Sequence, residues 1–296
     1  QPPPEQRVNV VDFVTQMVRI AIPYLFAASG GVIAERAGIV SLTLEGFMLS
    51  GAFGAALGTH YSGSPLVGVL SGILCGLIFS LIHALATIRY RADQVVVGVA
   101  INLLAIGVTR FFLKLAFDSS SNSPRVAGFG GNPAAAGFDN PLLWLGLLVA
   151  PVVAFMIYRT PYGLRVRAAG DHPEAAESVG VSVKRVRYLA VAASGILAGL
   201  GGVYLALDQH QFTDQMTAGR GFIAISAVIF GRWNPIRAAL ACLLFAAAET
   251  LQIQLQGSHA IPSQFIEMIP YVLTIIALAG VVGRSVAPAA LGKAAD

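Results

Sequence analysis

The sequence has 296 residues, of which 56% are hydrophobic and 11% are charged, with a formal net charge of +4 and a mean hydropathy of +0.72. Soluble domains carry about 25% charged residues, so this composition excludes an ordinary soluble domain and indicates a chain that folds in lipid. The cationic residues lie in short connections, which favours membrane topology over nucleic-acid binding. Cys75 and Cys242 lie in separate apolar runs, a spacing that indicates neither a disulfide framework nor a metal site.

Nine apolar runs approach the length of about 20 residues that a helix needs to cross a bilayer. They cover residues 12–34, 39–57, 65–87, 94–117, 141–158, 188–207, 222–231, 236–255 and 265–282. The alternating pattern of a membrane barrel is absent, so we expect helices. The seventh run is short and follows "TAGRG", which is typical of a half-span or a re-entrant segment. The sequence therefore predicts an all-α, polytopic membrane protein of about nine transmembrane segments, folded as a single domain over residues 1–296.

Two stretches hint at internal symmetry. "GGVIAERAGIVSLTLEG" (30–46) and "GGVYLALDQHQFTDQMTAGRGF" (201–222) each join a helix end to a Gly-interrupted segment, and across nine spans the two run in opposite directions. Inverted repeats with discontinuous helices recur in transporters, so a possible inverted repeat is expected here.

The cationic residues also predict an orientation. The charged block at 160–187 contains five of them, and if it is cytoplasmic, alternation places most other loop cations on the same side. These are Arg36, Arg89, Arg91, Arg232, Arg237, Arg284 and Lys293. By the positive-inside rule we expect the N-terminus outside, the C-terminus in the cytoplasm, and the Ser-, Gly- and Pro-rich loop 118–140 outside.

The charged block predicts a short capped helix. Asp171 is a good N-cap with Glu174 three residues on, Pro173 suits the first helical turn, and Gly180 is a natural stop. Ala175 and Ala176 would give this helix a small face that another protein could approach closely. The alternative is an ordinary amphipathic loop.

Polar side chains inside the apolar runs are the other candidates. A charged side chain such as Glu45 costs free energy within a membrane span. We therefore expect that it either accepts hydrogen bonds from a backbone break or lies on a substrate pathway. Gln94 and Asn102, eight residues apart, share one helix face and could line a polar path or bond across helices. Glu249 and Gln252 lie on one stripe with Gln256, which suits a water-filled vestibule or an interfacial helix end.

Three aromatic residues, Phe47, Phe222 and Trp233, could stack on a flat ligand or simply pack against lipid and neighbouring helices. No catalytic constellation is visible: the sequence has no Gly-x-x-x-x-Gly-Lys-Ser/Thr phosphate loop, no Gly-x-Ser-x-Gly elbow, and five histidines without ligand spacing. We therefore expect no enzymatic activity, no metal site and no cofactor of the chain's own.

"RVRAAGDHPEAAESVGVSVKRVR" resembles the cytoplasmic coupling loop of permease subunits in ATP-binding-cassette importers. "ERAGIVSLTLEGFMLSGAFGA", "ADQVVVGVAINLLAIGVTRFF", "ASGILAGLGGVYLAL" and "GRGFIAISAVIFGRWNP" resemble the same branch in the same order, over residues 20–283. This branch includes the simple-sugar, nucleoside and branched-chain amino acid permeases. The similarity is closest to the shorter nucleoside permease that works with a basic-membrane-protein type of binding protein.

The resemblance implies a site and partners. Within the loop 159–187, the ATPase-coupling residues would be Gly170, Asp171, Pro173, Glu174, Ala175, Ala176 and Gly180. Partners would be a second, related permease in a heterodimer, a cytoplasmic cassette ATPase that holds ATP and Mg, and an extracytoplasmic substrate-binding protein. In the family's Asn-x-Gly-x-Glu-Gly pattern, Ser41 and Thr43 replace Asn and Gly. Since the family's substrate path runs between the two permeases, the candidates for it are Glu45, Phe47, Gln94, Asn102, Glu249 and Gln252.

The sequence thus predicts a multi-pass permease of the plasma or inner membrane that forms half of the path for a nucleoside or similar small polar solute. A sugar or branched-chain amino acid permease is the alternative within the family. The alternative of another class is a stand-alone secondary transporter or channel, which would need its own coupling-ion site of several acidic groups.

Overall fold

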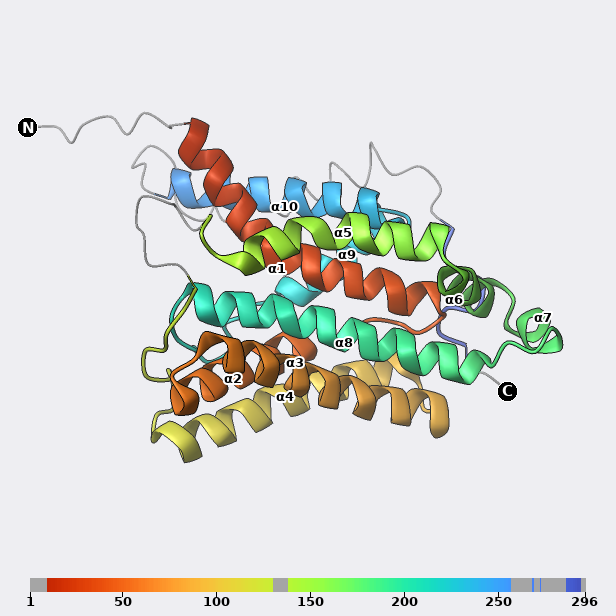
Figure 1. Ribbon diagram of the computed structural model, residues 1–296, viewed down its shortest axis with the longest axis horizontal. Helices are drawn as coiled ribbons and strands as arrows, with labels where there is room; N and C mark the ends of the chain where they lie inside the picture. The colour runs from red at the N-terminus through yellow and green to blue at the C-terminus, as the bar shows by residue number, and fades with distance from the viewer. Residues whose placement is uncertain (1–9, 130–137, 257–267, 269–271, 273–285, 294–296) are drawn as a thin grey trace, which may run out of the picture.

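The computed structural model describes residues 10–129, 138–256, 268, 272 and 286–293, and is drawn in Figure 1. Its elements are α1 (Val10–Arg36), α2 (Leu44–Ser62), α3 (Pro65–Ala84), the π-helix η1 (Leu85–Arg89), α4 (Gln94–Phe117), α5 (Pro141–Arg159), α6 (Pro161–Asp171), α7 (Pro173–Ser178), α8 (Val183–Asp208), α9 (Arg220–Phe230) and α10 (Pro235–Leu255). Among the described residues, β-structure is limited to one isolated bridge, between Asn122 and Thr213. The all-α prediction is confirmed.

Among the described residues, six helices are long and apolar enough to cross a membrane: α1, α3 extended by η1, α4, α5, α8 and α10. The nine predicted segments are therefore not confirmed. The second run, 39–57, divides between a non-helical connection and α2, and the seventh corresponds to the 11-residue helix α9. At 1.5 Å per residue α9 is about 16 Å long, about half of a bilayer core. The ninth run lies outside the described residues except for Met268 and Val272.

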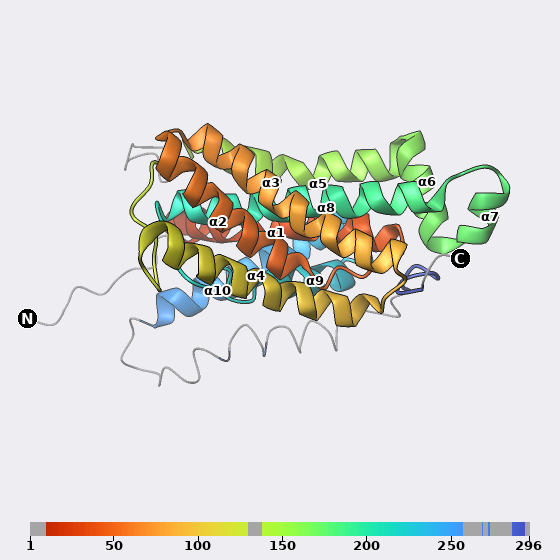
Figure 2. The same cartoon turned by 90° about the horizontal axis from the view of Figure 1, so that it is seen from below.

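Two helix–connection–helix units run in opposite directions through the bundle (Figure 1). Arg19, in α1, forms an ion pair of 3.0 Å with Asp208 at the end of α8, whereas Arg187, near the start of α8, donates to the Ala37 carbonyl after α1. The chain turns back after each long helix and starts a second one, α2 or α9, in the middle of the bundle (Figures 1 and 2). Helices α1 and α8 therefore run antiparallel, and the inverted repeat stays a prediction.

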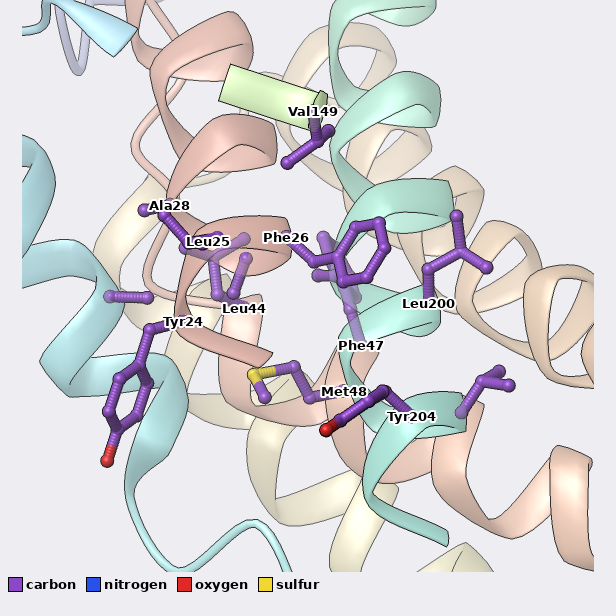
Figure 3. Packing of buried hydrophobic residues seen from close by; sticks show 14 of the residues in the cluster. Tyr24, Leu25, Phe26, Ala28, Leu44, Phe47, Met48, Val149, Leu200 and Tyr204 are labelled. Atoms are coloured by element: carbon purple, nitrogen blue, oxygen red, sulfur yellow. The ribbon is translucent and has the colours of Figure 1, made fainter. Parts of the chain in front are cut away.

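Close contact between backbones holds α2 inside the bundle. A Cβ atom on Gly202 of α8 would lie 1.8 Å from the Met48 carbonyl oxygen of α2, and a Cβ on Gly51 would lie 2.4 Å from the Gly199 carbonyl oxygen. Around this seam, Phe26, Phe47, Met48 and Leu200 are packed together (Figure 3). Helices in lipid associate through such small residues because burying apolar side chains there gains little.

We predict that Gly202→Ala lowers the melting temperature of the detergent-purified protein by several degrees or more, since overpacking costs about 1–3 kcal/mol even where atoms can move aside. Here the obstacle is the backbone of α2. Gly107→Ala is the matched control, because a Cβ on Gly107 of α4 meets nothing within 4 Å. Its melting temperature should be unchanged or slightly higher, and equal losses in both variants would contradict the packing described above.

Candidate translocation cavity and coupling element

The Glu45 carboxylate lies where the first turns of α2 and α9 meet. Its Oε1 atom accepts hydrogen bonds from the Thr217 hydroxyl at 2.6 Å and the Gly219 N–H at 2.9 Å, and its Oε2 atom accepts from the Gly221 N–H at 2.7 Å. Both helix N-termini carry partial positive charge, which a carboxylate compensates. The interpretation that Glu45 accepts hydrogen bonds from a backbone break is therefore confirmed.

The polar face of α4 holds the connection that precedes α2. Asn102 accepts from the Gly46 N–H at 2.9 Å and donates to the Leu42 carbonyl at 2.8 Å, and Gln94 accepts from the Val40 N–H at 2.8 Å. The shared face predicted for Gln94 and Asn102 is confirmed, and it bonds across helices to backbone. The chain is non-helical from 37 to 43 although Ser41 and Thr43 depart from the family's pattern.

A cavity of about 370 Å³ opens beside these contacts, between α2, α4, α9 and the connection that precedes α9. Glu45 and Asn102 lie in its wall together with Gln215, Thr217 and Phe222. Its volume falls at the lower end of the range of small-molecule pockets, about 300–1,000 Å³. Two of the predicted substrate-path residues therefore share one cavity.

The remaining candidates lie elsewhere. Phe47 is buried and packs edge-on against His83, with ring centroids 6.2 Å apart. Gln94 is 4% exposed, and its side-chain oxygen is already bonded to the Val40 backbone N–H. Glu249 on α10 accepts a hydrogen bond from Tyr24 and forms an ion pair of 3.0 Å with Arg220 of α9. Neither Glu249 nor Gln252, one turn further along α10, lines the cavity.

Sequence reasoning missed the contact that holds the other end of α9. Glu35 in α1 accepts from the Ser41 N–H at 3.2 Å and from the Trp233 indole N–H at 2.5 Å, and Arg36 donates to the Trp233 carbonyl at 2.8 Å. Trp233 follows α9 and is buried, so it packs and cannot stack on a ligand as considered from the sequence. The sequence feature that points to Glu35 is its position as a carboxylate directly before a helix break.

The charged block forms α6 and α7, which project from one end of the bundle (Figures 1 and 2). The predicted capping box is wrong: Asp171 is the last residue of α6, and the N-cap of α7 is His172, without a side-chain cap bond. The cause is Pro173, since a residue before proline is pushed into extended backbone, and His172 has φ −141° and ψ 76°. Gly180, at φ +84°, follows α7, so the predicted stop is confirmed.

The two alanines of α7 do not form a common face. Ala176 is buried, whereas Glu174 and Ala175 are exposed. Val179, which follows α7, is 77% exposed and was not singled out from the sequence. In the first turn of α6, burial raises the pKa of the Tyr162 hydroxyl above its ordinary value. The projecting tip therefore offers an exposed surface made of Glu174, Ala175 and Val179.

The base of this element is joined to the connection after α1. A Cβ atom on Gly170 would lie 2.1 Å from the Arg36 carbonyl oxygen, and the Gly170 carbonyl accepts from the Ala290 N–H at 2.9 Å. Gly38 accepts from the Gly292 N–H at 3.2 Å. The buried Arg187 donates to the Lys293 carbonyl at 3.1 Å as well as to Ala37. Residues 286–293 thus link α6, α8 and the end of α1.

Membrane-length helices around a half-length helix and a cavity, with a helical element projecting from one end, form the architecture of a transport permease. The model of the permease component of branched-chain amino acid transport systems matches residues 13–278, and the chain belongs to that family.

Curated relatives agree with this assignment. The guanosine ABC transporter permease protein NupQ of Bacillus subtilis is 40% identical over 92% of this chain and 92% of its own length. The nucleoside permease protein NupC of Lactococcus lactis is 37% identical over 96% and 98%. The putative glucose permease protein TsgC13 of Haloferax volcanii is 36% identical over 81% and 76%. Lactococcus lactis also has a more distant nucleoside permease protein, NupB, 24% identical over 77% of this chain.

We predict that Glu45→Gln destabilises the protein by about 2–4 kcal/mol, because an amide NH₂ replaces one of two oxygens that accept hydrogen bonds in a buried site. At roughly 2 °C or more per kcal/mol, the melting temperature should fall by at least about 4 °C. Asp118→Asn is the control: its side chain is 93% exposed and paired with Lys114. A Glu45→Gln variant as stable as this control would show that the carboxylate does not hold α9.

Proposed function

We propose that this chain is the shorter permease subunit of an ATP-driven importer for nucleosides and forms half of the translocation path. The observation that carries the proposal is the 40% identity to a guanosine permease over 92% of both chains. The cavity supports it, since among the described residues its lining includes no cation and one acid, Glu45, which is already compensated. A glucose permease is also among the relatives, so a sugar is the alternative solute.

The proposal includes a second, related permease and a cytoplasmic ATPase. In Lactococcus lactis two nucleoside permeases occur, one similar to this chain over nearly its whole length and one more distant, which is consistent with a heterodimer. The ATPase would receive the tip of Glu174, Ala175 and Val179. ATP and Mg would be held by that partner, while this chain supplies the moving helices.

A chain of contacts would carry motion from this tip to the cavity. Gly170 at the base of α6 abuts the Arg36 carbonyl, and Glu35 and Arg36 hold Trp233 at the end of α9. The other end of α9 is held by Glu45, in the cavity wall. Closure of the ATPase would therefore shift α9 and alternate access to the cavity.

The proposed orientation places α6 and α7 in the cytoplasm and the N-terminus outside. Arg165 and Arg167 belong to α6 itself, and Arg36 and Arg187 lie near its Gly170 end, so these four basic residues share the end of the bundle that carries this element. The positive-inside rule assigns that end to the cytoplasm. A substrate-binding protein would then dock at the opposite end.

The function is tested by uptake of radiolabelled guanosine into proteoliposomes that contain this chain, its second permease and the ATPase, with the binding protein added outside. Uptake should require ATP and all four components. Guanosine uptake by this chain alone, without ATP, would overturn the importer in favour of a stand-alone transporter. Uptake of glucose in place of guanosine would assign the alternative solute.

We predict that Ala175→Trp abolishes guanosine uptake and the stimulation of ATP hydrolysis by loaded binding protein, because a bulky side chain on an exposed surface of α7 blocks close approach of the ATPase. Ala175→Ser is the conservative control and should retain uptake within about twofold, since surface changes are usually worth under 0.5 kcal/mol. Both variants should keep the wild-type melting temperature. Full uptake by Ala175→Trp would remove α7 from the ATPase contact.

A further inference from the structure

The cavity wall has few polar groups that are still free to bond a solute. Glu45 already accepts three hydrogen bonds from Thr217, Gly219 and Gly221. Asn102 uses its oxygen on Gly46 and one of its two amide protons on Leu42. A solute in this cavity therefore meets a compensated charge, and an anion or cation would find no free counter-ion in the part of the lining that the structure describes.

Two side chains in the lining remain available. Phe222, in the first turn of α9, is 46% exposed. Gln215 is exposed, and its amide makes none of the hydrogen bonds found among the described residues. An aromatic face and a side chain with both donor and acceptor are the groups that bind a flat heterocycle, by stacking and by its polar edge.

The backbone that presents Gln215 is held in an uncommon conformation. Gln215 and Ala218 are in the left-handed region, at φ 54° and 46°, although neither is glycine. The preceding residue, Asp214, is fixed by an ion pair of 2.7 Å with Arg110 and by its N–H bond of 2.8 Å to the Ser121 carbonyl. Such strain persists only where the surroundings impose it, and it clusters at ligand-binding sites.

We propose that Phe222 and Gln215 recognise the base of the nucleoside: the Phe222 ring stacks on the base, and the Gln215 amide bonds to its polar edge. The inference rests on the proposed function and adds the chemical group that the cavity selects. The ribose contacts the apolar side chains and the backbone of the wall. The two residues therefore discriminate between bases and against free sugars.

The test uses the complete importer in proteoliposomes, with uptake of guanosine and cytidine measured at saturating binding protein. Phe222→Leu, which keeps an apolar side chain but loses the ring, should reduce uptake of both nucleosides roughly tenfold. Phe222→Tyr should retain most uptake. Phe111→Leu is the matched control, because Phe111 on α4 is 64% exposed and lies outside the cavity lining.

Gln215→Leu should change the ratio of guanosine to cytidine uptake severalfold, because the two bases present different polar edges. Gln209→Leu, an exposed glutamine in the same connection, should leave the ratio unchanged. An unchanged ratio in Gln215→Leu, or wild-type uptake in Phe222→Leu, would overturn the inference while the proposed function stands. A wild-type complex that transports no nucleoside would instead overturn the proposed function.

Photolabelling of the wild-type complex with 8-azidoguanosine keeps the inference testable if Phe222→Leu fails to fold. The label should map to the peptide that contains residues 215–222 and should be displaced by excess guanosine but not by ribose. Displaceable labelling confined to other peptides of this chain or to the second permease would overturn the assignment.

Discussion

The structure depends on one carboxylate shared by two helix N-termini. A helix that starts in the middle of a membrane bundle leaves N–H groups without water to bond them, and each such group is costly in lipid. Glu45 accepts two backbone N–H groups and one hydroxyl from the start of α9 while standing in the first turn of α2. It also separates two like-signed helix ends. Without this acceptor, the Gly219 and Gly221 N–H groups at the start of α9 would lose their hydrogen-bond partner.

The opposite end of α9 has a similar arrangement, supplied by α1. Glu35 accepts the indole N–H of Trp233 and Arg36 donates to its carbonyl, at a point where Arg232 and Trp233 both take positive φ. Both carboxylates thus hold α9 against the rest of the bundle rather than facing solvent. Hydrogen bonds within the protein therefore account for both carboxylates at this depth.

Sequence reasoning located what is set by local pattern. It identified the all-α class, the shared face of Gln94 and Asn102, and the stop at Gly180, but not the number of membrane-length helices in the described part of the chain. The predictions failed for contacts, caps and burial that depend on more than the local pattern. Glu35 and Trp233 are 198 residues apart, so the position of Glu35 before a helix break does not reveal its partner. Asp171 fits a capping box, but the restriction before Pro173 outweighs that preference, and the burial of Ala176 depends on how α7 folds back on its neighbours.

In the proposed mechanism, helix α9 would join the ATPase-coupling contact and the recognition of the base on one short helix. Its first turn carries Phe222 in the cavity wall, and its C-terminal end is held by the residues that abut the base of α6. An 11-residue helix is about 16 Å long, so in this mechanism a displacement of its Trp233 end would also displace Phe222. Linkage requires the converse: a solute that favours one position of α9 must bias the position of the coupling element to the same extent. Since Glu45 joins the start of α9 to α2 and lies in the cavity wall, the proposed mechanism would make this contact the pivot between the two effects.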